Sequence, residues 1–312
     1  MIDTVRMTGD YQIVYELLDK APWTNNYVYE NRTDNGMIGE IYEYKKKGEA
    51  VRLKYNQNTE KMTVEVSIPK FLFGHNVRTV SDIDISRFFQ RLNDYLRNKF
   101  YAYPKHEPYY WKVQRMDVCW NFQVGEAVSD YIQAFSHIHI PRYSTCVYGG
   151  GETVVWQNRS KRMSFYDKHQ EIKAHKGSPE VIEQSLGILR FEANITDKNL
   201  VRYSPNRWAG ELIKEPVAKD IIFKHLHRLG IDNHLTVSNR KEVATRLISE
   251  YGESKAWQLL GFIEYKMLYG DQSINQPSKT TYDRRINELV RLGIAPIYTD
   301  KELPPLNLNE II

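Results

Sequence analysis

The sequence predicts an α+β fold, in which an antiparallel sheet carries helices on one face and a helical C-terminal region follows. Segments with alternating apolar and polar residues dominate the chain up to about residue 200, which is the pattern of half-buried strands. Beyond that point, apolar residues recur with helical spacing. The 312 residues suffice for one large domain or two smaller ones. We expect a first domain over residues 1–205 and a helical second domain over residues 206–312.

Composition limits the class of protein. Hydrophobic residues make up 41% of the chain and charged residues 26%, as in soluble globular proteins. No apolar run approaches the ~20 residues of a membrane span, and the N-terminus lacks the pattern of a signal peptide. The two cysteines have no metal-ligand spacing, which favours a reducing cytoplasm. Aromatic residues at 12%, mostly tyrosine, suit stacking on single-stranded nucleic acid, although tyrosine-rich sheets have the same composition.

The strand over residues 61–68 has the clearest alternation. Its apolar residues would face a core, and Thr63, Glu65 and Ser67 would face outward. We predict further strands over residues 1–8, 38–44, 50–55, 109–124, 152–156, 160–169 and 187–195.

The first long helix is predicted over residues 81–100. Ser81 can cap its N-terminus, and the expected buried residues are Ile83, Ile85, Phe88, Leu92 and Leu96. Short helices are expected over residues 11–18 and 126–136, and a helical connection over residues 167–185. The C-terminal helices are predicted over residues 217–228, 239–250, 253–269 and 279–292.

Tyr166 and Lys168 belong to the strand around which we organise the site. On a strand they would share one face with Arg162. A phenol can attack a phosphate, and a nearby ammonium can assist the phenol or the phosphoryl oxygens. The chain has 22 tyrosines, however, so a solvated edge strand can carry this pair by chance.

Three carboxylates occupy the polar faces of other predicted strands: Glu65, Asp117 and Glu192. If one open sheet face carries all three, their mutual repulsion favours a bound divalent cation, Mg²⁺ or Mn²⁺. The alternative is that each acid pairs with a base such as Arg115 or Arg190 on a solvated face.

Histidines offer a second possible set of metal ligands. His137 and His139 would share a face if they lay on a strand, but they follow a predicted helix and precede a proline. They therefore look like part of a connection. Whether His75, His137, His139 or Glu152 binds metal stays open from the sequence.

The segment 278–294 has the character of a DNA-reading helix. Hydroxyl and basic side chains begin it, including Lys279, Arg284 and Arg285, and Gly293 ends it. An ordinary amphipathic surface helix fits the same pattern equally well. Arg162 and tyrosines of the sheet face are expected to hold an unpaired DNA strand.

Six short motifs in one order resemble a known family. They are Val64-Glu65-Val66, Phe73-Gly74-His75-Asn76-Val77, Arg115-Met116-Asp117, Glu152-Thr153-Val154-Val155-Trp156, Tyr166-Asp167-Lys168-His169 and Leu189-Arg190-Phe191-Glu192-Ala193. Together they resemble the gene II/gene X replication initiators of filamentous phages and related plasmids, mainly over residues 60–200.

The resemblance implies a Rep-like nicking-joining domain and a site- and strand-specific nickase that starts rolling-circle replication. Tyr166 falls on the family's tyrosine, which stays joined to the 5′ phosphate. The resemblance further implies a replication origin, single-stranded or supercoiled, as substrate, a host helicase and polymerase as partners, and the cytoplasm of a bacterial host. The two-histidine metal motif of the wider nickase superfamily is not recognisable in this sequence.

Two other functions remain open from the sequence. A mobilisation relaxase would normally carry its tyrosine near the N-terminus and a three-histidine cluster, and this sequence has neither. A non-enzymatic regulator would bind the origin through the helix at 278–294 and would leave DNA uncut.

Overall fold

The structure is a computed structural model that describes residues 1–13, 15–31, 37–231, 238–269 and 277–299, together with residues 303, 306 and 308. The chain forms two compact units. The first unit comprises Met1–Val118 and Asn194–Ala218, and the second comprises Cys119–Ala193 and Lys219–Ile312. These units are defined by which residues pack together, and their boundaries differ from the predicted boundary at residue 205. That boundary stays a prediction about functional domains.

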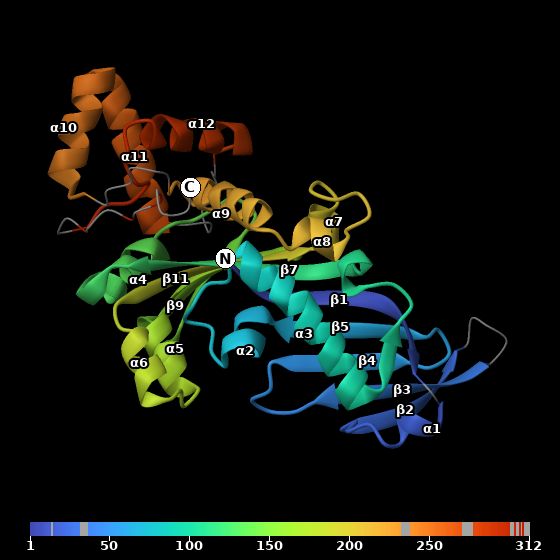
Figure 1. The fold of residues 1–312 in the computed structure, drawn as a ribbon. Helices are drawn as coiled ribbons and strands as arrows, with labels where there is room; N and C mark the ends of the chain where they lie inside the picture. The colour runs from blue at the N-terminus through green and yellow to red at the C-terminus, as the bar shows by residue number, and fades with distance from the viewer. Residues whose placement is uncertain are drawn as a thin grey trace. The chain divides into compact units, whose positions relative to one another are not determined.

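The first unit is built on an antiparallel sheet (Figure 1). Its strands follow the order β2-β3-β4-β5-β1-β7, and β6 pairs with β1. The strand bounds are β1 Ile2–Ile13, β2 Asn25–Asn31, β3 Met37–Lys45, β4 Val51–Asn56, β5 Lys61–Ser67, β6 Ala102–Pro104 and β7 Lys112–Gln123. Alternate residues of β5 are buried as predicted, because Met62, Val64 and Val66 face the core.

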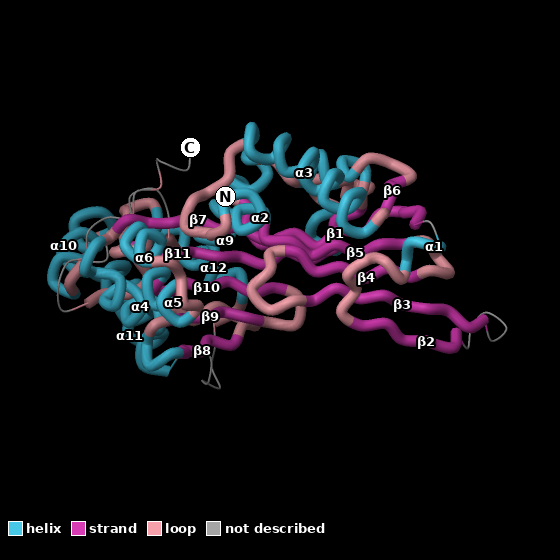
Figure 2. The backbone as a smooth tube through the Cα atoms, turned by 60° about the horizontal axis from the view of Figure 1, so that its bottom comes forward, coloured by secondary structure: helices cyan, strands magenta, loops and turns pink. Residues whose placement is uncertain are grey.

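Helix α3 (Asp82–Phe100) covers one face of this sheet, as Figures 1 and 2 both show. Ser81 begins it with a capping box that includes Asp84, which confirms the predicted N-terminus. Phe88, Leu92 and Leu96 are fully buried against the strands. Ile83 was expected beside them but is 75% exposed. It lies two residues before Ile85 and therefore roughly 160° around the helix from the buried stripe.

The other helical segments of the first unit are short: α1 Tyr15–Leu18, α2 Ile68–Phe73, α7 Asp197–Leu200, α8 Ala209–Leu212 and the 3₁₀ turn η1 Pro108–Tyr110. The helix expected over residues 11–18 is wrong at its start, because β1 continues to Ile13. Tyr11 pairs with Pro104 of β6, and its ring lies edge-on to Trp111 at 4.9 Å. Sheet pairing and burial therefore outweigh the local helical pattern.

In the described part of the second unit, strands follow the order β11-β10-β9-β8, and the end of β7 also belongs to this unit. Their bounds are β8 Ser144–Tyr148, β9 Thr153–Gln157, β10 Lys161–Asp167 and β11 Ile188–Thr196. The β10–β9 and β9–β8 pairs are antiparallel. Strand β8 was not predicted from the sequence. Phe165 of β10 packs against the rings of Phe135, Trp156 and Phe191, which form the centre of this core.

The helices of the second unit match their predicted places. They are α4 Val128–Ser136, α5 Lys168–Ala174, α6 Pro179–Gln184, α9 Glu215–Leu229, α10 Arg240–Tyr251, α11 Glu253–Tyr269 and α12 Lys279–Val290, with 3₁₀ turns η2 Gly125–Ala127 and η3 Gly149–Gly151. Buried side chains of α10, α11 and α12, such as Leu247, Leu259 and Ile286, share one apolar cluster.

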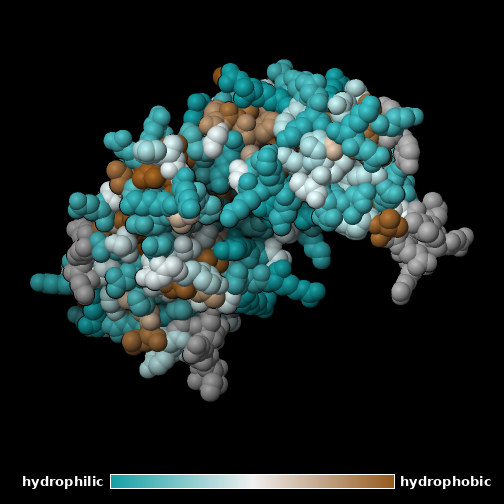
Figure 3. All heavy atoms as spheres, turned by 90° about the horizontal axis from the view of Figure 1, so that it is seen from below, coloured by the Kyte–Doolittle hydropathy of each residue, from teal (hydrophilic) through white to brown (hydrophobic). Residues whose placement is uncertain are grey.

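The face of the molecule seen in Figure 3 is predominantly polar. Hydrophilic side chains cover most of the view in Figure 3, and hydrophobic ones form small, separate patches. Among the described residues, no helix is both long enough and apolar enough to cross a membrane.

Candidate active site

Tyr166 lies near the end of β10, in the second unit. Its hydroxyl donates a hydrogen bond of 3.1 Å to Glu192 Oε2, on the neighbouring strand β11. The Glu192 side chain is 31% exposed, so solvent or a substrate can reach the carboxylate. The structure therefore brings together the predicted nucleophile and one of the three predicted metal ligands.

Arg190 lies beside Glu192, two residues earlier on β11, and only 1% of its side chain is exposed. Arg190 Nε is 3.9 Å from Glu192 Oε2, and Nη1 donates to Asn121 Oδ1 at 3.5 Å. A buried guanidinium beside the carboxylate stabilises the charge of Glu192. The alternative interpretation of the acids placed Arg190 on a solvated face, and its burial corrects that part of the interpretation.

Lys168 does not continue the Tyr166 strand. Strand β10 ends at Asp167, whose side chain accepts hydrogen bonds from the backbone N–H groups of His169 and Gln170 and so starts α5 at Lys168. The Lys168 side chain is fully buried, and its ammonium forms a 2.6 Å ion pair with Glu171 Oε2. The same ammonium lies 5.8 Å from the centre of the Tyr166 ring. Lys168 therefore lies beside the Tyr166 ring, and its positive charge is paired with Glu171.

Glu65 and Asp117 lie together in the first unit, joined by one arginine. Arg115 Nη2 is 2.9 Å from Asp117 Oδ2, and Arg115 Nη1 is 3.8 Å from Glu65 Oε2. The Asn194 amide also donates to Asp117 Oδ1. Asp117 is only 6% exposed, so the predicted open, solvated face is wrong at this position. The bridging guanidinium is the partner that the alternative interpretation of these acids predicts.

Glu65 and Asp117 do not fit a shared cation as they are arranged in the first unit. Among the residues that the structure describes, no group of three or more His, Cys, Asp or Glu side chains is placed to hold a metal ion. Arg115 occupies the position between Glu65 and Asp117 that a shared cation would need. A cation could bind both acids only if this guanidinium moved away.

The histidine alternative finds no support in the backbone. His137 is the C-terminal cap of α4, and His139 lies in the connection to β8, so neither belongs to a strand. His75 accepts a 3.4 Å hydrogen bond from the Val77 N–H through Nδ1. Glu152 follows the η3 turn and is exposed, as a solvated strand end would be.

Two other tyrosines of the second unit could compete with Tyr166 as nucleophile. Tyr143 is 4% exposed, and burial raises the pKa of its hydroxyl. Tyr148 is 49% exposed, and its hydrogen bond with the Cys146 thiol raises its pKa. Tyr166 is the one of the three whose hydroxyl donates to a carboxylate.

The predicted DNA-binding cations lie at different places in the second unit. Arg162 of β10 and Arg284 of α12 are exposed, and Lys279 is the first residue of α12. The Arg285 guanidinium lies 5.2 Å from the centre of the Phe262 ring, so this side chain helps to pack α12 against α11.

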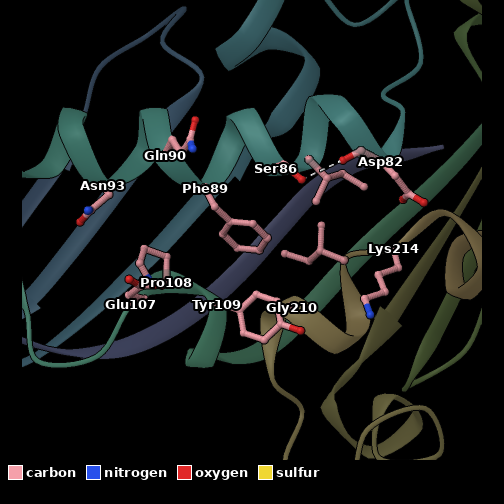
Figure 4. A pocket seen from close by; sticks show the side chains of 12 residues that line it. Asp82, Ser86, Phe89, Gln90, Asn93, Glu107, Pro108, Tyr109, Gly210 and Lys214 are labelled. Atoms are coloured by element: carbon pink, nitrogen blue, oxygen red, sulfur yellow. Dashed lines mark hydrogen bonds between the residues drawn. The ribbon is translucent and has the colours of Figure 1, made fainter.

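A cavity of about 620 Å³ lies beside α3 in the first unit. Figure 4 shows the Phe89 ring pointing from α3 toward the side of the cavity formed by Tyr109, and the two ring centres are 6.2 Å apart. Asp82 and Glu107 line it with Lys214, so acids outnumber bases. This charge balance does not suit a phosphate group. The sequence offered no signal for the cavity, because its lining comes from three separate segments.

A comparison with protein families agrees with the resemblance seen in the sequence. A model of the family described as the N-terminal part of a phage replication-associated protein matches residues 22–213. A solved structure of a rolling circle replication initiator protein from Geobacillus stearothermophilus aligns with 73% of this chain and 84% of its own, at 11% identity and a TM-score of 0.33. No curated protein matches the chain. Because the family match covers more than half of the sequence, the chain belongs to this family of phage replication-associated proteins.

Proposed function

We propose that this protein initiates rolling-circle replication by nicking and rejoining one DNA strand through Tyr166. The observation that carries the proposal is the hydrogen bond from the Tyr166 hydroxyl to Glu192. A nucleophile needs a base within hydrogen-bond distance, and this pair meets that condition. Family membership supports a role in replication.

In the nicking step, the Tyr166 oxygen attacks the scissile phosphorus and its proton passes to Glu192. The bond from phosphorus to the 3′ oxygen breaks, the 3′ oxygen takes up a proton from solvent, and a phosphotyrosyl bond to the 5′ phosphate forms. In the joining step, a 3′ hydroxyl attacks the phosphotyrosine and releases its proton to solvent, and the Tyr166 oxygen leaves with the proton held by Glu192. Each step exchanges one phosphate ester for another, so no energy source is required.

Arg190 and Lys168 act as positioning residues in this scheme. The buried guanidinium of Arg190 lies 3.9 Å from Glu192 and favours its charged form, and the buried Lys168–Glu171 ion pair lies beside the Tyr166 ring. The sequence also predicts that the Lys168 ammonium assists the phosphate during the reaction. That role would require the ammonium to leave Glu171.

A requirement for Mg²⁺ or Mn²⁺, with Glu65, Asp117 and Glu192 as ligands, also remains a prediction. The scheme above routes no step through a cation, because Arg115 already bridges two of the three acids.

The test is covalent capture of DNA on Tyr166. After reaction with a 3′-labelled origin oligonucleotide, we expect mass spectrometry of a digest to find a nucleotide adduct on the Tyr166 peptide. Tyr166→Phe keeps the ring but removes the hydroxyl, so nicking and strand transfer should disappear. Tyr148→Phe is the matched control and should react normally. An adduct on another tyrosine, or joining by Tyr166→Phe, would contradict the proposal. A closed plasmid after incubation with the wild-type protein would favour a non-enzymatic origin-binding regulator.

The natural substrate in this proposal is a replication origin in the cytoplasm of a bacterial host, with a host helicase and polymerase acting afterwards. Helix α12 would contact the duplex through Lys279, Arg284 and Arg285. Arg284→Gln should weaken origin binding and reduce its log–log salt dependence by about 0.9 for the lost phosphate contact. Cleavage of a short single-stranded oligonucleotide should survive, and its loss with unchanged duplex affinity would assign α12 to the reaction instead.

A further inference from the structure

A second cavity in the first unit lies along β1, β5 and β7 and has a volume of about 670 Å³. We refer to it as the β1 groove. Five lysine and arginine residues line it: Arg6, Lys61, Lys112, Arg115 and Arg207. Asp10 and Asp197 are the acids of the lining, so bases exceed acids by three. Its volume lies in the ordinary range for ligand sites of roughly 300–1,000 Å³.

Three of these cations are available to a ligand. Arg207 already pairs with Asp197 at 3.2 Å, and Arg115 pairs with Asp117 and Glu65. Within the part of the chain that the structure describes, Arg6, Lys61 and Lys112 form no ion pair, and all three are exposed. A concave site with uncommitted cations attracts an anionic ligand.

Strand pairing places these cations on three adjacent strands. Arg6 of β1 faces Glu65 of β5 and Arg115 of β7, while Lys112 of β7 faces Thr8 of β1. On β5, Lys61 faces Asp10. The positive charge therefore runs across the sheet, as an extended phosphate backbone would require, and is not gathered at one point.

A bulge in β7 shapes the wall of the groove. Arg6 faces Arg115 and Met7 faces Val113, so Gln114 is an extra residue between them. Consecutive residues of a regular strand point to opposite faces, but here Gln114 and Arg115 both line the groove. The bulge thereby adds an amide beside a guanidinium on the same side of the strand.

The aromatic part of the groove is tightly packed and partly accessible. Trp111 is 1% exposed and donates through Nε1 to the His106 carbonyl at 3.1 Å. A Cβ at Gly9 would come within 2.6 Å of the indole, so only glycine permits this contact. Tyr110, next in the chain, is 52% exposed and also lines the groove. An exposed ring beside uncommitted cations can stack an unpaired base.

We propose that the β1 groove binds a short segment of single-stranded DNA, with Arg6, Lys61 and Lys112 on its phosphates and Tyr110 on a base. The identity of the nucleic acid as DNA rests on the proposed nicking function. A duplex fits less well, because stacking on Tyr110 requires a base free of its neighbours.

The test measures binding without cleavage. A fluorescein-labelled oligothymidylate without origin sequence is titrated with the full chain carrying Tyr166→Phe, and anisotropy is followed at several salt concentrations. Adding Arg6→Gln, Lys61→Gln and Lys112→Gln should weaken binding at least tenfold near ~0.1 M salt and reduce the log–log salt slope by about 0.7 for each lost contact. Tyr110→Leu should weaken binding roughly tenfold with an unchanged slope.

The matched control removes three exposed cations of the same unit outside the groove, by Lys20→Gln, Lys47→Gln and Arg87→Gln. It should leave affinity nearly unchanged, and circular dichroism should show all variants folded. Equal losses in the control and groove variants would overturn the assignment. If heparin or duplex DNA displaces the oligothymidylate as well as unlabelled single strand does, at equal concentration of negative charge, that result would overturn the assignment too. It would indicate a surface that binds any polyanion. Since wild-type adduct formation on Tyr166 is measured separately, failure of the groove leaves the nicking proposal standing.

Discussion

The two units contain the same short motif in opposite arrangements. In the first unit Arg115 is followed two residues later by Asp117, and in the second Arg190 is followed two residues later by Glu192. The acid is buried in the first pair, with side-chain exposures of 33% for Arg115 and 8% for Asp117. The arginine is buried in the second pair, with exposures of 1% for Arg190 and 31% for Glu192.

This reversal separates two roles for a strand carboxylate. Asp117 lies 2.9 Å from the guanidinium of Arg115 and accepts a second hydrogen bond from Asn194, so the carboxylate oxygens of Asp117 are already engaged. Glu192 lies 3.9 Å from Arg190, remains accessible and accepts a hydrogen bond from the Tyr166 hydroxyl. A carboxylate that must accept and return a proton has to be accessible, whereas breaking a buried ion pair is costly for the fold. We therefore propose proton transfer for Glu192 and structural support for Asp117.

Metal removal is the strongest way to break this comparison. If the sequence-based prediction of a bound cation holds, EDTA should abolish nicking, and Mg²⁺ or Mn²⁺ should restore it. The measurement is relaxation of a supercoiled origin plasmid with and without EDTA. Undiminished nicking in EDTA would remove the predicted metal role of all three acids and leave the Tyr166–Glu192 pair as the reactive centre.

Glu192→Gln sharpens the comparison at the proposed reactive centre. The amide keeps the shape of the side chain but is a poor proton acceptor, so nicking should slow by about 10²–10⁴-fold. Hydroxide can then replace the carboxylate as the base that accepts the Tyr166 proton. The nicking rate of the variant should therefore rise more steeply with pH than that of the wild type. A metal ligand would behave differently, because excess Mn²⁺ and not alkaline pH would rescue the variant. Glu180→Gln, on the exposed surface of α6, is the control and should react normally.

Many elements of this fold follow from the sequence, although β2, β6, β8 and α2 were not predicted. Alternation in 61–68 predicts the buried residues of β5, and Ser81 with its early acids predicts the start of α3. The helices α9 to α12 also lie where apolar spacing placed them. These features depend on local periodicity and capping, which a single sequence contains.

The environment of each polar side chain was much harder to predict. Alternation places Arg190 and Asp117 on a polar face, but only the neighbouring strands and their side chains determine that both are buried. Lys168 was predicted on the strand but lies in α5, because Asp167 caps the start of that helix. The bulge at Gln114 likewise depends on how β7 pairs with β1. Exposure and partners are tertiary properties, so the roles of the carboxylates could be proposed but not distinguished from the sequence.

The smallest expected effect tests the structural half of the comparison. Asp117→Ala removes a buried acceptor of Arg115 and Asn194, so the free energy of unfolding should fall by about 1–3 kcal/mol. Arg52→Ala is the matched control: it removes a surface ion pair with Glu65 at 3.2 Å, in which Arg52 is 56% exposed, and should cost less than about 1 kcal/mol. Urea unfolding followed by circular dichroism measures both.

A loss for Asp117→Ala no larger than that for Arg52→Ala would mean that the buried acid contributes little to folding, and its role would then have to be sought in metal binding. Asp117→Asn separates the remaining contributions. The amide retains an oxygen that can accept a hydrogen bond from Arg115 but lacks the negative charge. We therefore expect Asp117→Asn to fall between the wild type and Asp117→Ala in stability. Normal stability of Asp117→Asn combined with lost nicking would reverse the assignment of roles, because charge at Asp117 would then serve the reaction and not the fold.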